Sequence, residues 1–436
     1  MHLTNRVVPM KSLFGPFAIL MGVSFLPIGA VSAGTLVASS CSTTAVQAAV
    51  NSAAEGDSVE IPNGSCSWTA RVLIAGKGIH VKAQSSQGVT LTHNAGGGTL
   101  FEIDRDGSHS TRISGIRFMN GSGTGTFIDI SGRGKPWLVD DCYFQSTGQL
   151  FQTLRATANG GVFWDNVVEA PAGKYHLNGN IQINAGAYGT TEWQLPPTLG
   201  SADTTGESNT YIESNTFTGI LQVTIDASNG GRIVFRHNTM RDAATVVHGA
   251  DTDQFGGVRH FEFYDNTFTR VSDSYPINRW FYIRGGTGVI ADNVFPDASS
   301  SSYPNKQEID LTIQNLRRSD GPYACWSGGY PAPHQVGQVT DSRDSTPSWP
   351  LAIWNNTKPG GAAWVAGEGN YISISDYPSS ECGAGAPSAS TFIVRDRDYI
   401  TRQPAGYTKY TYPHPLARGD DATKPLPPAG VTIGTP

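Results

Sequence analysis

Residues 261–268, FEFYDNTF, contain a phrase that recurs through the middle of the chain. Related phrases occur at 163–168 (FWDNVV), 212–217 (IESNTF), 235–240 (FRHNTM) and 289–295 (VIADNVF). Their Asn residues are separated by 49, 23, 28 and 27 positions, and the first gap is close to two periods. A repeat of this length with strand-like composition is typical of a β-solenoid, in which each repeat forms one coil.

Alignment on this Asn extends the repeat back to Cys142 and Ile116 and reveals two apolar columns. The column three residues earlier holds Ile113, Val139, Phe163, Ile212, Phe235, Phe263 and Ile290. The column two residues later holds Phe118, Phe144, Val168, Phe217, Met240, Phe268 and Phe295. We expect both columns to point inward as ladders, one coil above the next at ~4.8 Å. The Asn column itself is predicted to form turns, because Asn tolerates the left-handed conformation and bonds to nearby backbone.

The first 33 residues read as a targeting segment. Arg6 and Lys11 precede a long apolar run that ends at the small-residue site Val31-Ser32-Ala33, as in secretory signal peptides. We therefore expect a secreted or periplasmic protein with no membrane association after cleavage. The chain has a net charge of −6, which argues against a nucleic-acid partner because such proteins carry basic surfaces.

Five cysteines fit an oxidising compartment. Cys41 and Cys66 bracket a short N-terminal unit, whereas Cys325 and Cys382 bracket a C-terminal region. We pair them in this way and leave Cys142 free, although spacing alone does not fix connectivity. No CxxC or His-x-x-x-His pair is present, so we predict no zinc site and no required cofactor.

The segment CSTTAVQAAVNSAAEGDSVEIPNGSC (41–66) predicts a capped amphipathic helix followed by a turn and a strand. Such a helix would close the open end of the coil and protect its edge from pairing with other chains. With this cap and the Asn repeat, the chain resembles secreted bacterial members of the pectin-lyase-like superfamily. That resemblance implies an all-β, right-handed parallel β-helix with an N-terminal capping helix and a loop-rich C-terminal region. We expect a signal peptide over 1–33, a cap over 34–66, coils over 67–300, and loops, a last coil and a packed tail over 301–436.

A second strand in each coil carries an apolar residue, then a polar one, then a small one. The polar column reads Asp129, Arg155, Asn184, Asp226, His248 and Arg284. Alternation along the strand sends this column outward. Asp226, His248 and Arg284 are then predicted to form a carboxylate–imidazole–guanidinium cluster on three successive coils, beside the long loops that follow Asn184 and His248.

Further residues are candidates for binding a sugar chain beside this cluster. Trp280 and Tyr282 share the outward parity of Arg284, and Tyr188 and Trp193 lie in the long loop after Asn184. Arg155, Arg232 and Arg259 would add positive charge, and Asn184 would also contact the sugar chain. Glu262 is predicted on an outer face within reach of Arg232 or Arg236, as a substrate contact or as part of a surface ion-pair lattice.

The resemblance implies a polysaccharide partner, and three functions remain open. A lyase needs a base, a group that neutralises the uronate carboxylate and an acid; His248, oriented by Asp226, would be the base and Arg284 the neutralising group. Calcium could assist through Asp226 with Asp251 or Asp253. A hydrolase would pair Asp226 with Asp251, Asp253 or Glu192. A non-catalytic glycan-binding solenoid is the third. The polygalacturonase motifs and the Arg-x-Pro-x-x-Arg of pectate lyases are absent. We favour the lyase and expect a monomer.

Overall fold

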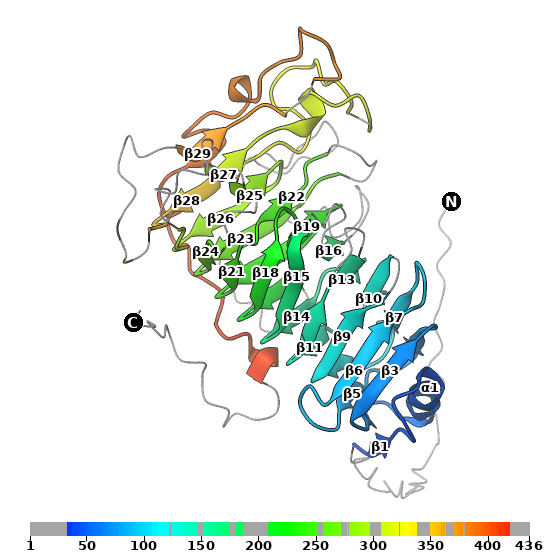
Figure 1. The fold of residues 1–436 in the computed structure, drawn as a ribbon. Helices are drawn as coiled ribbons and strands as arrows, with labels where there is room; N and C mark the ends of the chain where they lie inside the picture. Colours follow the sequence, from blue (N-terminus) through cyan, green and yellow to red (C-terminus); the bar gives the residue numbers. More distant parts are fainter. Residues whose placement is uncertain are drawn as a thin grey trace, which may run out of the picture. The chain divides into compact units, whose positions relative to one another are not determined.

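The computed structural model describes residues 33–418, apart from 122–123, 147–150, 175–179, 186–207, 251–255, 272–276, 278, 297–306, 322, 338–348, 359, 361, 363–369 and 378–379. The predicted targeting segment therefore lies outside the described residues, apart from Ala33. Within the described part, the chain runs repeatedly through three all-parallel sheets, in the order sheet A, sheet B, sheet C (Figure 1). The fold is a right-handed parallel β-helix: the repeat predicted the solenoid, and the resemblance implied its right-handed parallel form.

Sheet A consists, in spatial order, of β1 (Thr35–Val37), β2 (Ser58–Ile61), β5 (His80–Ala83), β8 (Arg112–Ser114), β11 (Trp137–Asp140), β14 (Gly161–Trp164), β17 (Thr210–Glu213), β20 (Arg232–Arg236), β23 (His260–Tyr264), β26 (Thr287–Ala291), β28 (Leu351–Trp354) and β30 (Tyr399–Ile400). Sheet B consists of β3 (Gly64–Trp68), β6 (Val89–His93), β9 (Ile116–Asn120), β12 (Tyr143–Gln145), β15 (Val167–Lys174), β18 (Thr216–Ile220), β21 (Thr239–Arg241) and β24 (Thr267–Thr269). Sheet C consists of β4 (Val72–Ile74), β7 (Thr99–Asp104), β10 (Gly125–Ser131), β13 (Phe151–Ala156), β16 (Ile181–Asn184), β19 (Ile225–Ser228), β22 (Thr245–Val247), β25 (Arg279–Ile283), β27 (Gln307–Leu311) and β29 (Asn370–Ile374).

The two predicted apolar columns line the interior. Every member of both columns is buried, at 1% exposure or less. Rings from successive coils stack on one another; Phe118 and Phe144, for example, lie with centroids 4.8 Å apart and nearly parallel planes. The repeat thus buries one continuous apolar core, which is the main source of stability in such folds.

The Asn column forms a buried ladder at the corner between sheets A and B. The Oδ1 atom of Asn266 accepts hydrogen bonds from the backbone N and from Nδ2 of Asn238, both at 3.0 Å. Asn238 Nδ2 also donates to the Ile212 carbonyl at 2.9 Å. The same pattern links Asn166, Asn215, Asn238, Asn266, Asn293 and Asn356.

The prediction that the Asn residues adopt the left-handed conformation was wrong. The residue immediately before each Asn has positive φ instead: Asp165, Ser214, His237, Asp265 and Asp292, at 51–59° with their equivalents in neighbouring coils. The Asn side chain is needed for the buried hydrogen bonds, so the tight turn is made by its neighbour, where Asp and Asn are also tolerated.

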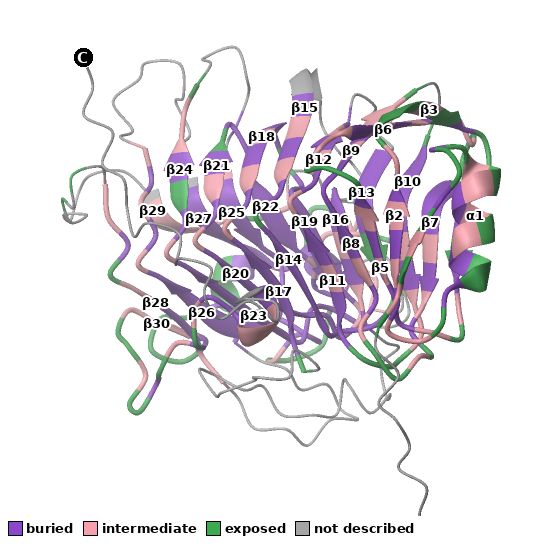
Figure 2. Cartoon of the chain, turned by 90° about the horizontal axis from the view of Figure 1, so that it is seen from below, coloured by how far each residue is buried: buried purple, intermediate pink, exposed green. Residues whose placement is uncertain are grey.

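The predicted capping helix is present as α1 (Thr43–Ser52). Ser42 is its N-cap and accepts a hydrogen bond from Ala45 N. Val46 and Val50 face the core, whereas the other side of the helix is partly exposed (Figure 2). At the C-terminal end, Lys77 Nζ donates to the carbonyls of Val50 and Ala53 at 2.9 and 2.7 Å. A cation at this end of a helix satisfies carbonyls that have no intrahelical partner.

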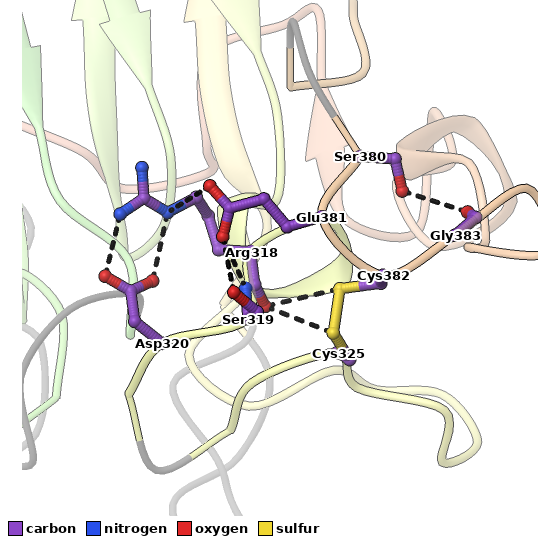
Figure 3. Close-up of a disulfide and its surroundings, with 8 residues drawn as sticks. All are labelled: Arg318, Ser319, Asp320, Cys325, Ser380, Glu381, Cys382 and Gly383. Atoms are coloured by element: carbon purple, nitrogen blue, oxygen red, sulfur yellow. Dashed lines mark hydrogen bonds and ion pairs between the residues drawn. A yellow bond between two sulfur atoms is a disulfide. The ribbon is translucent and has the colours of Figure 1, made fainter.

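Both predicted disulfides are present. Cys41 is bonded to Cys66, Cys325 is bonded to Cys382, and Cys142 is free and buried. The second disulfide joins two loops of the C-terminal region, and both sulfur atoms lie near the Arg318 carbonyl (Figure 3). The helical turns η1 (Gln314–Leu316) and η3 (Ala389–Thr391) lie in the same region and contribute Leu316 and Ala389 to the core.

The last described residues form an extended C-terminal strap, residues 404–418, which ends in η4 (Pro415–Arg418). The strap lies on the outer face of sheet A. Tyr407 donates to Glu262 at 2.8 Å, Asn209 donates to Tyr410 at 3.2 Å, and His414 N donates to Glu213 at 2.8 Å. Its side chains form an apolar cluster with outward residues of sheet A, including Tyr211 and Tyr264. The part of sheet A from β14 to β28 is therefore covered on both faces. Among the described residues, no helix is long and apolar enough to span a membrane.

Candidate functional site

Asp226 and His248 meet on the outer face of sheet C. Asp226 belongs to β19, and His248 follows directly after β22. His248 Nε2 lies 2.9 Å from Asp226 Oδ1, and the side chains are 21% and 8% exposed. The two atoms are at hydrogen-bond distance but not in hydrogen-bond alignment, which is common for catalytic pairs before a substrate binds. A carboxylate in this position stabilises the protonated imidazole.

Asp226 and His248 lie diagonally across two adjacent strands. The single outward column predicted from the sequence is in fact two columns of the sheet, and the two residues belong to different ones. Asp226 is in register with Val246, not with His248. Asn184 is in register with Ser228, whose hydroxyl donates to the Asn184 amide oxygen at 2.5 Å. Period-2 alternation leaves the register ambiguous by two residues, since positions i and i+2 face the same way. His248 therefore reaches back to Asp226 across one strand spacing and two residues.

Arg284 is the next residue along the His248 column. Its backbone N donates to Val247 O at 3.1 Å, which places it one strand beyond His248. The Arg284 side chain donates to the Gln314 amide oxygen, and its guanidinium carbon lies 5.6 Å from the Tyr282 ring centroid. Arg284 is only 8% exposed. The structure thus brings the three predicted catalytic residues to one place, with Arg284 held from the C-terminal side by Gln314.

Trp280 and Tyr282 are not available as sugar-stacking platforms. Trp280 was expected to point outward, but it belongs to the interior core, where its ring lies 5.4 Å from that of Phe268. The two rings meet because Phe268 comes from sheet B and Trp280 from sheet C, so they fill the corner between the sheets. Tyr282 does face outward, but it is covered in a small cluster with Val223 and Val246.

The Tyr282 ring lies beside two guanidinium groups. The Arg279 guanidinium carbon lies 3.9 Å from the ring centroid, and the Arg284 guanidinium carbon lies 5.6 Å from it. Burial raises the pKa of the Tyr282 hydroxyl above its ordinary value, and this hydroxyl has no hydrogen-bond partner in the described part of the chain. Arg279 is paired with the fully buried carboxylate of Asp310, whose pKa burial likewise raises.

Arg232, Arg259 and Glu262 do not lie beside the cluster. Arg232 begins β20 and Arg259 precedes β23, both at sheet A, and all three residues are at most 3% exposed. Glu262 accepts a hydrogen bond from Tyr407 of the strap. The prediction of an exposed substrate contact or a surface lattice was therefore wrong for these residues. The strap covers Glu262, and local alternation does not reveal that a distant segment returns to lie there.

Arg155 lies on the outer face of sheet C, as predicted. Its side chain is 44% exposed and pairs with Asp129, with Nε 3.0 Å from Oδ1. Arg155 is in register with Gln182, and Gln182 is in register with Asp226. A row of polar side chains therefore leads from Arg155 to the His248 pair.

Some candidates lie outside the described residues: Tyr188, Trp193, Glu192, Asp251 and Asp253. Within the described ranges, no group of three or more His, Cys, Asp or Glu side chains is arranged to hold a metal ion. The possible calcium ligands Asp251 and Asp253 lie outside the described residues.

Two site residues were missed by the sequence analysis. Gln314 lies in η1 and holds Arg284, but it belongs to none of the repeated phrases. Gln182 occupies the outward position beside Asp226; placing the register two residues earlier would have found it, because it follows Ile181 as Arg155 follows Leu154.

Comparisons with known proteins give structural likenesses at low identity. No known protein family's profile matches the sequence, and no curated protein matches it. Among solved structures, an alginate lyase from Paenibacillus sp. str. FPU-7 is similar at 13% identity and a TM-score of 0.39, covering 86% of this chain and 97% of its own. A PL6 family polysaccharide lyase from Pseudopedobacter saltans is similar at 12% identity and 0.39, covering 92% and 97%. The catalytic domain of a GH87 alpha-1,3-glucanase in complex with nigerose is similar at 11% identity and 0.31, covering 85% and 68%.

Proposed function

We propose that this protein is an extracytoplasmic polysaccharide lyase that cleaves a uronate-containing glycan on the outer face of sheet C. The observation that carries the proposal is the 2.9 Å approach of His248 Nε2 to Asp226, with Arg284 next along the His248 column. The two disulfides support an oxidising compartment, since such bonds persist mainly in exported proteins.

His248 acts as the general base. When a bound substrate aligns Nε2 with the Asp226 carboxylate, the favoured neutral tautomer carries its hydrogen on Nε2 and a lone pair on Nδ1. Nδ1 then removes the proton on the carbon α to the uronate carboxylate. Asp226 stabilises the imidazolium that forms, so the pair is matched to the charge that develops during the reaction.

Arg284 neutralises the substrate carboxylate. Removing the α proton spreads negative charge onto that carboxylate, and a guanidinium held in a partly dry site stabilises this charge more than it would in water. The electron pair of the broken C–H bond forms the new C=C bond as the bond to the 4-O-linked sugar breaks. The His248 imidazolium returns its proton, directly or through water, to the leaving oxygen, so that His248 regains its neutral form and the product is an unsaturated uronate.

Hydrolysis by two carboxylates finds no partner for Asp226 along its column in the described residues; Glu192, Asp251 and Asp253 lie outside them. Hydrolases place their two carboxyl groups ~5–9.5 Å apart. In the column of Asp226, the nearest described carboxylates are Asp129 and Asp310, each three strands away, which corresponds to roughly 14 Å. Both are also ion-paired, with Arg155 and Arg279 respectively.

The test is a screen of the mature protein against uronate-containing and neutral polysaccharides, recording both absorbance near 230 nm and reducing ends. We expect a rise in absorbance that disappears in His248→Ala and falls by a factor of ~100 or more in Asp226→Asn. His109→Ala is the matched control, because His109 Nδ1 lies 3.0 Å from Glu55 in a similar pair at the N-terminal end of the fold. This variant should keep full activity.

Other outcomes would replace the proposal. Reducing ends without absorbance would indicate hydrolysis. Binding of a polysaccharide by a folded protein that generates neither signal would indicate a glycan-binding solenoid.

A further inference from the structure

A cavity of about 320 Å³ lies on the outer face of sheet C, away from the His248 pair. Its lining comes from the first coils and includes Arg71, Thr99, Glu102, Thr126, Asp129 and Arg155. This volume is at the small end of the range for ligand sites, and it suits one or two sugar rings. No residue of the proposed catalytic cluster contributes to its lining.

The cavity and the His248 pair are joined by one row of side chains in register. Glu102, Asp129, Arg155, Gln182 and Asp226 occupy the same outward position on β7, β10, β13, β16 and β19. Arg155, at the near edge of the cavity, is therefore two strand spacings from Asp226, or roughly 10 Å, and Asp129 is three, or roughly 14 Å. One strand spacing is close to the rise per sugar of an extended polysaccharide, so a chain lying along the row would place its second or third sugar in the cavity.

The charges in the cavity are balanced. Arg71 pairs with Glu102 at 3.0 Å, and Arg155 pairs with Asp129 through Nε at 3.0 Å. Each guanidinium already faces a carboxylate, so neither is a ready partner for a uronate, and the two carboxylates would repel one. Paired guanidinium and carboxylate groups instead offer donors and acceptors at fixed positions, which suits adjacent hydroxyl groups.

On the other side of the reaction site, the residues of this row are no longer charged. Beyond Asp226 the column continues with Val246 and then Tyr282, which are covered in an apolar cluster. The only cationic group beside His248 along its own column, within the described residues, is Arg284. The outer face of sheet C therefore separates a place for a negatively charged sugar, at Arg284, from a charge-balanced cavity several coils away.

We propose that this cavity is a binding subsite for a neutral pyranose residue, two to three sugars from the linkage cleaved beside His248. The inference rests on the proposed function, because the cavity is a subsite only if cleavage takes place beside His248. It narrows the substrate to a polysaccharide that combines uronate and neutral sugars. A homopolymer of uronate would place a carboxylate against Glu102 and Asp129 and would bind less well.

The test measures binding separately from cleavage. Cellotriose, mannotriose and galactotriose are titrated by calorimetry into the mature His248→Ala protein, with trigalacturonate as the charged comparison. We expect at least one neutral trisaccharide to bind, and to bind at least ten-fold more weakly when Arg155→Met is added, because a hydrogen bond to a charged group is lost. Asp129→Asn, which keeps the shape of the cavity, should weaken binding in the same direction.

The matched control is Arg112→Met. Arg112 and Asp140 form a similar two-bond pair at 2.7 and 2.6 Å in the neighbouring coils, but on sheet A, so this change should leave binding unchanged. The inference is overturned if no neutral trisaccharide binds, if binding is indifferent to both cavity variants, or if trigalacturonate binds as tightly as the best neutral one. Neutral-sugar binding without any 230 nm product would sink the lyase proposal alone, whereas 230 nm product without such binding would sink the subsite alone.

Discussion

Replacing Arg236 by Met should detach the C-terminal strap from sheet A. Arg236 in β20 is fully buried beneath the strap. Its Nε donates to Glu213 at 2.8 Å, and its terminal nitrogens donate to the backbone carbonyls of Tyr410 and Thr411, each at 2.8 Å. One side chain thus joins a buried carboxylate of the coil to two consecutive carbonyls of the strap.

The expected loss is large because Glu213 is buried as well. After Arg236→Met, the Glu213 carboxylate keeps the His414 N–H at 2.8 Å but has lost its counter-charge. Breaking a buried ion pair by removing one partner costs about 3–5 kcal/mol. In Glu213→Gln/Arg236→Met no buried charge remains, so the double variant should be more stable than Arg236→Met by about 1–3 kcal/mol.

The assay is denaturant unfolding of the four members of this mutant cycle, together with tryptic cleavage of the native proteins at Lys409. Arg236→Met should expose the strap and speed that cleavage. Arg71→Met is the comparison, because the side chains of Arg71 and its partner Glu102 are 55% and 33% exposed and such a surface pair contributes about 1 kcal/mol or less. A loss below 1 kcal/mol for Arg236→Met, or a double variant less stable than Arg236→Met, would refute the reasoning.

Three other properties can be checked on the same protein. Asn266→Ala removes a side chain that bonds two carbonyls and its ladder neighbours, so unfolding should require about 2–4 kcal/mol less, measured by denaturation. Burial, Arg236 and Lys409 together lower the pKa of His237 to about 3, so the folded state resists a proton that the unfolded state accepts below about 6.5. Stability should be complete above pH 6.5 and should fall as the pH drops toward 3, less steeply in His237→Asn, when unfolding is followed across pH. Burial also raises the pKa of the Cys142 thiol, so a thiol reagent should label one cysteine only after unfolding without reductant.

The sequence determined the coil and its interior. The two apolar columns around Phe263 and Phe268 recur once per coil, and burial of such columns is a local property of alternation and period. The disulfide pairs could also be predicted, since each pair brackets a unit that folds as one region. The Asn ladder was predicted, but the left-handed turn conformation was assigned to the Asn and belongs to the residue before it. Composition alone does not say which of two adjacent turn-forming residues takes positive φ.

Only the tertiary structure decided the register of the strands in sheet C and the burial of outward residues of sheet A. Alternation fixes which face a residue takes but not which of two equivalent positions it occupies, so Asp226 was placed beside His248 in a column and is found diagonal to it. Glu262 was assigned to the surface by the same rule, yet Tyr407, 145 residues away, covers it. Outward parity is written in each strand, whereas burial of an outward face depends on a segment that returns from far along the chain, and no local pattern encodes that return.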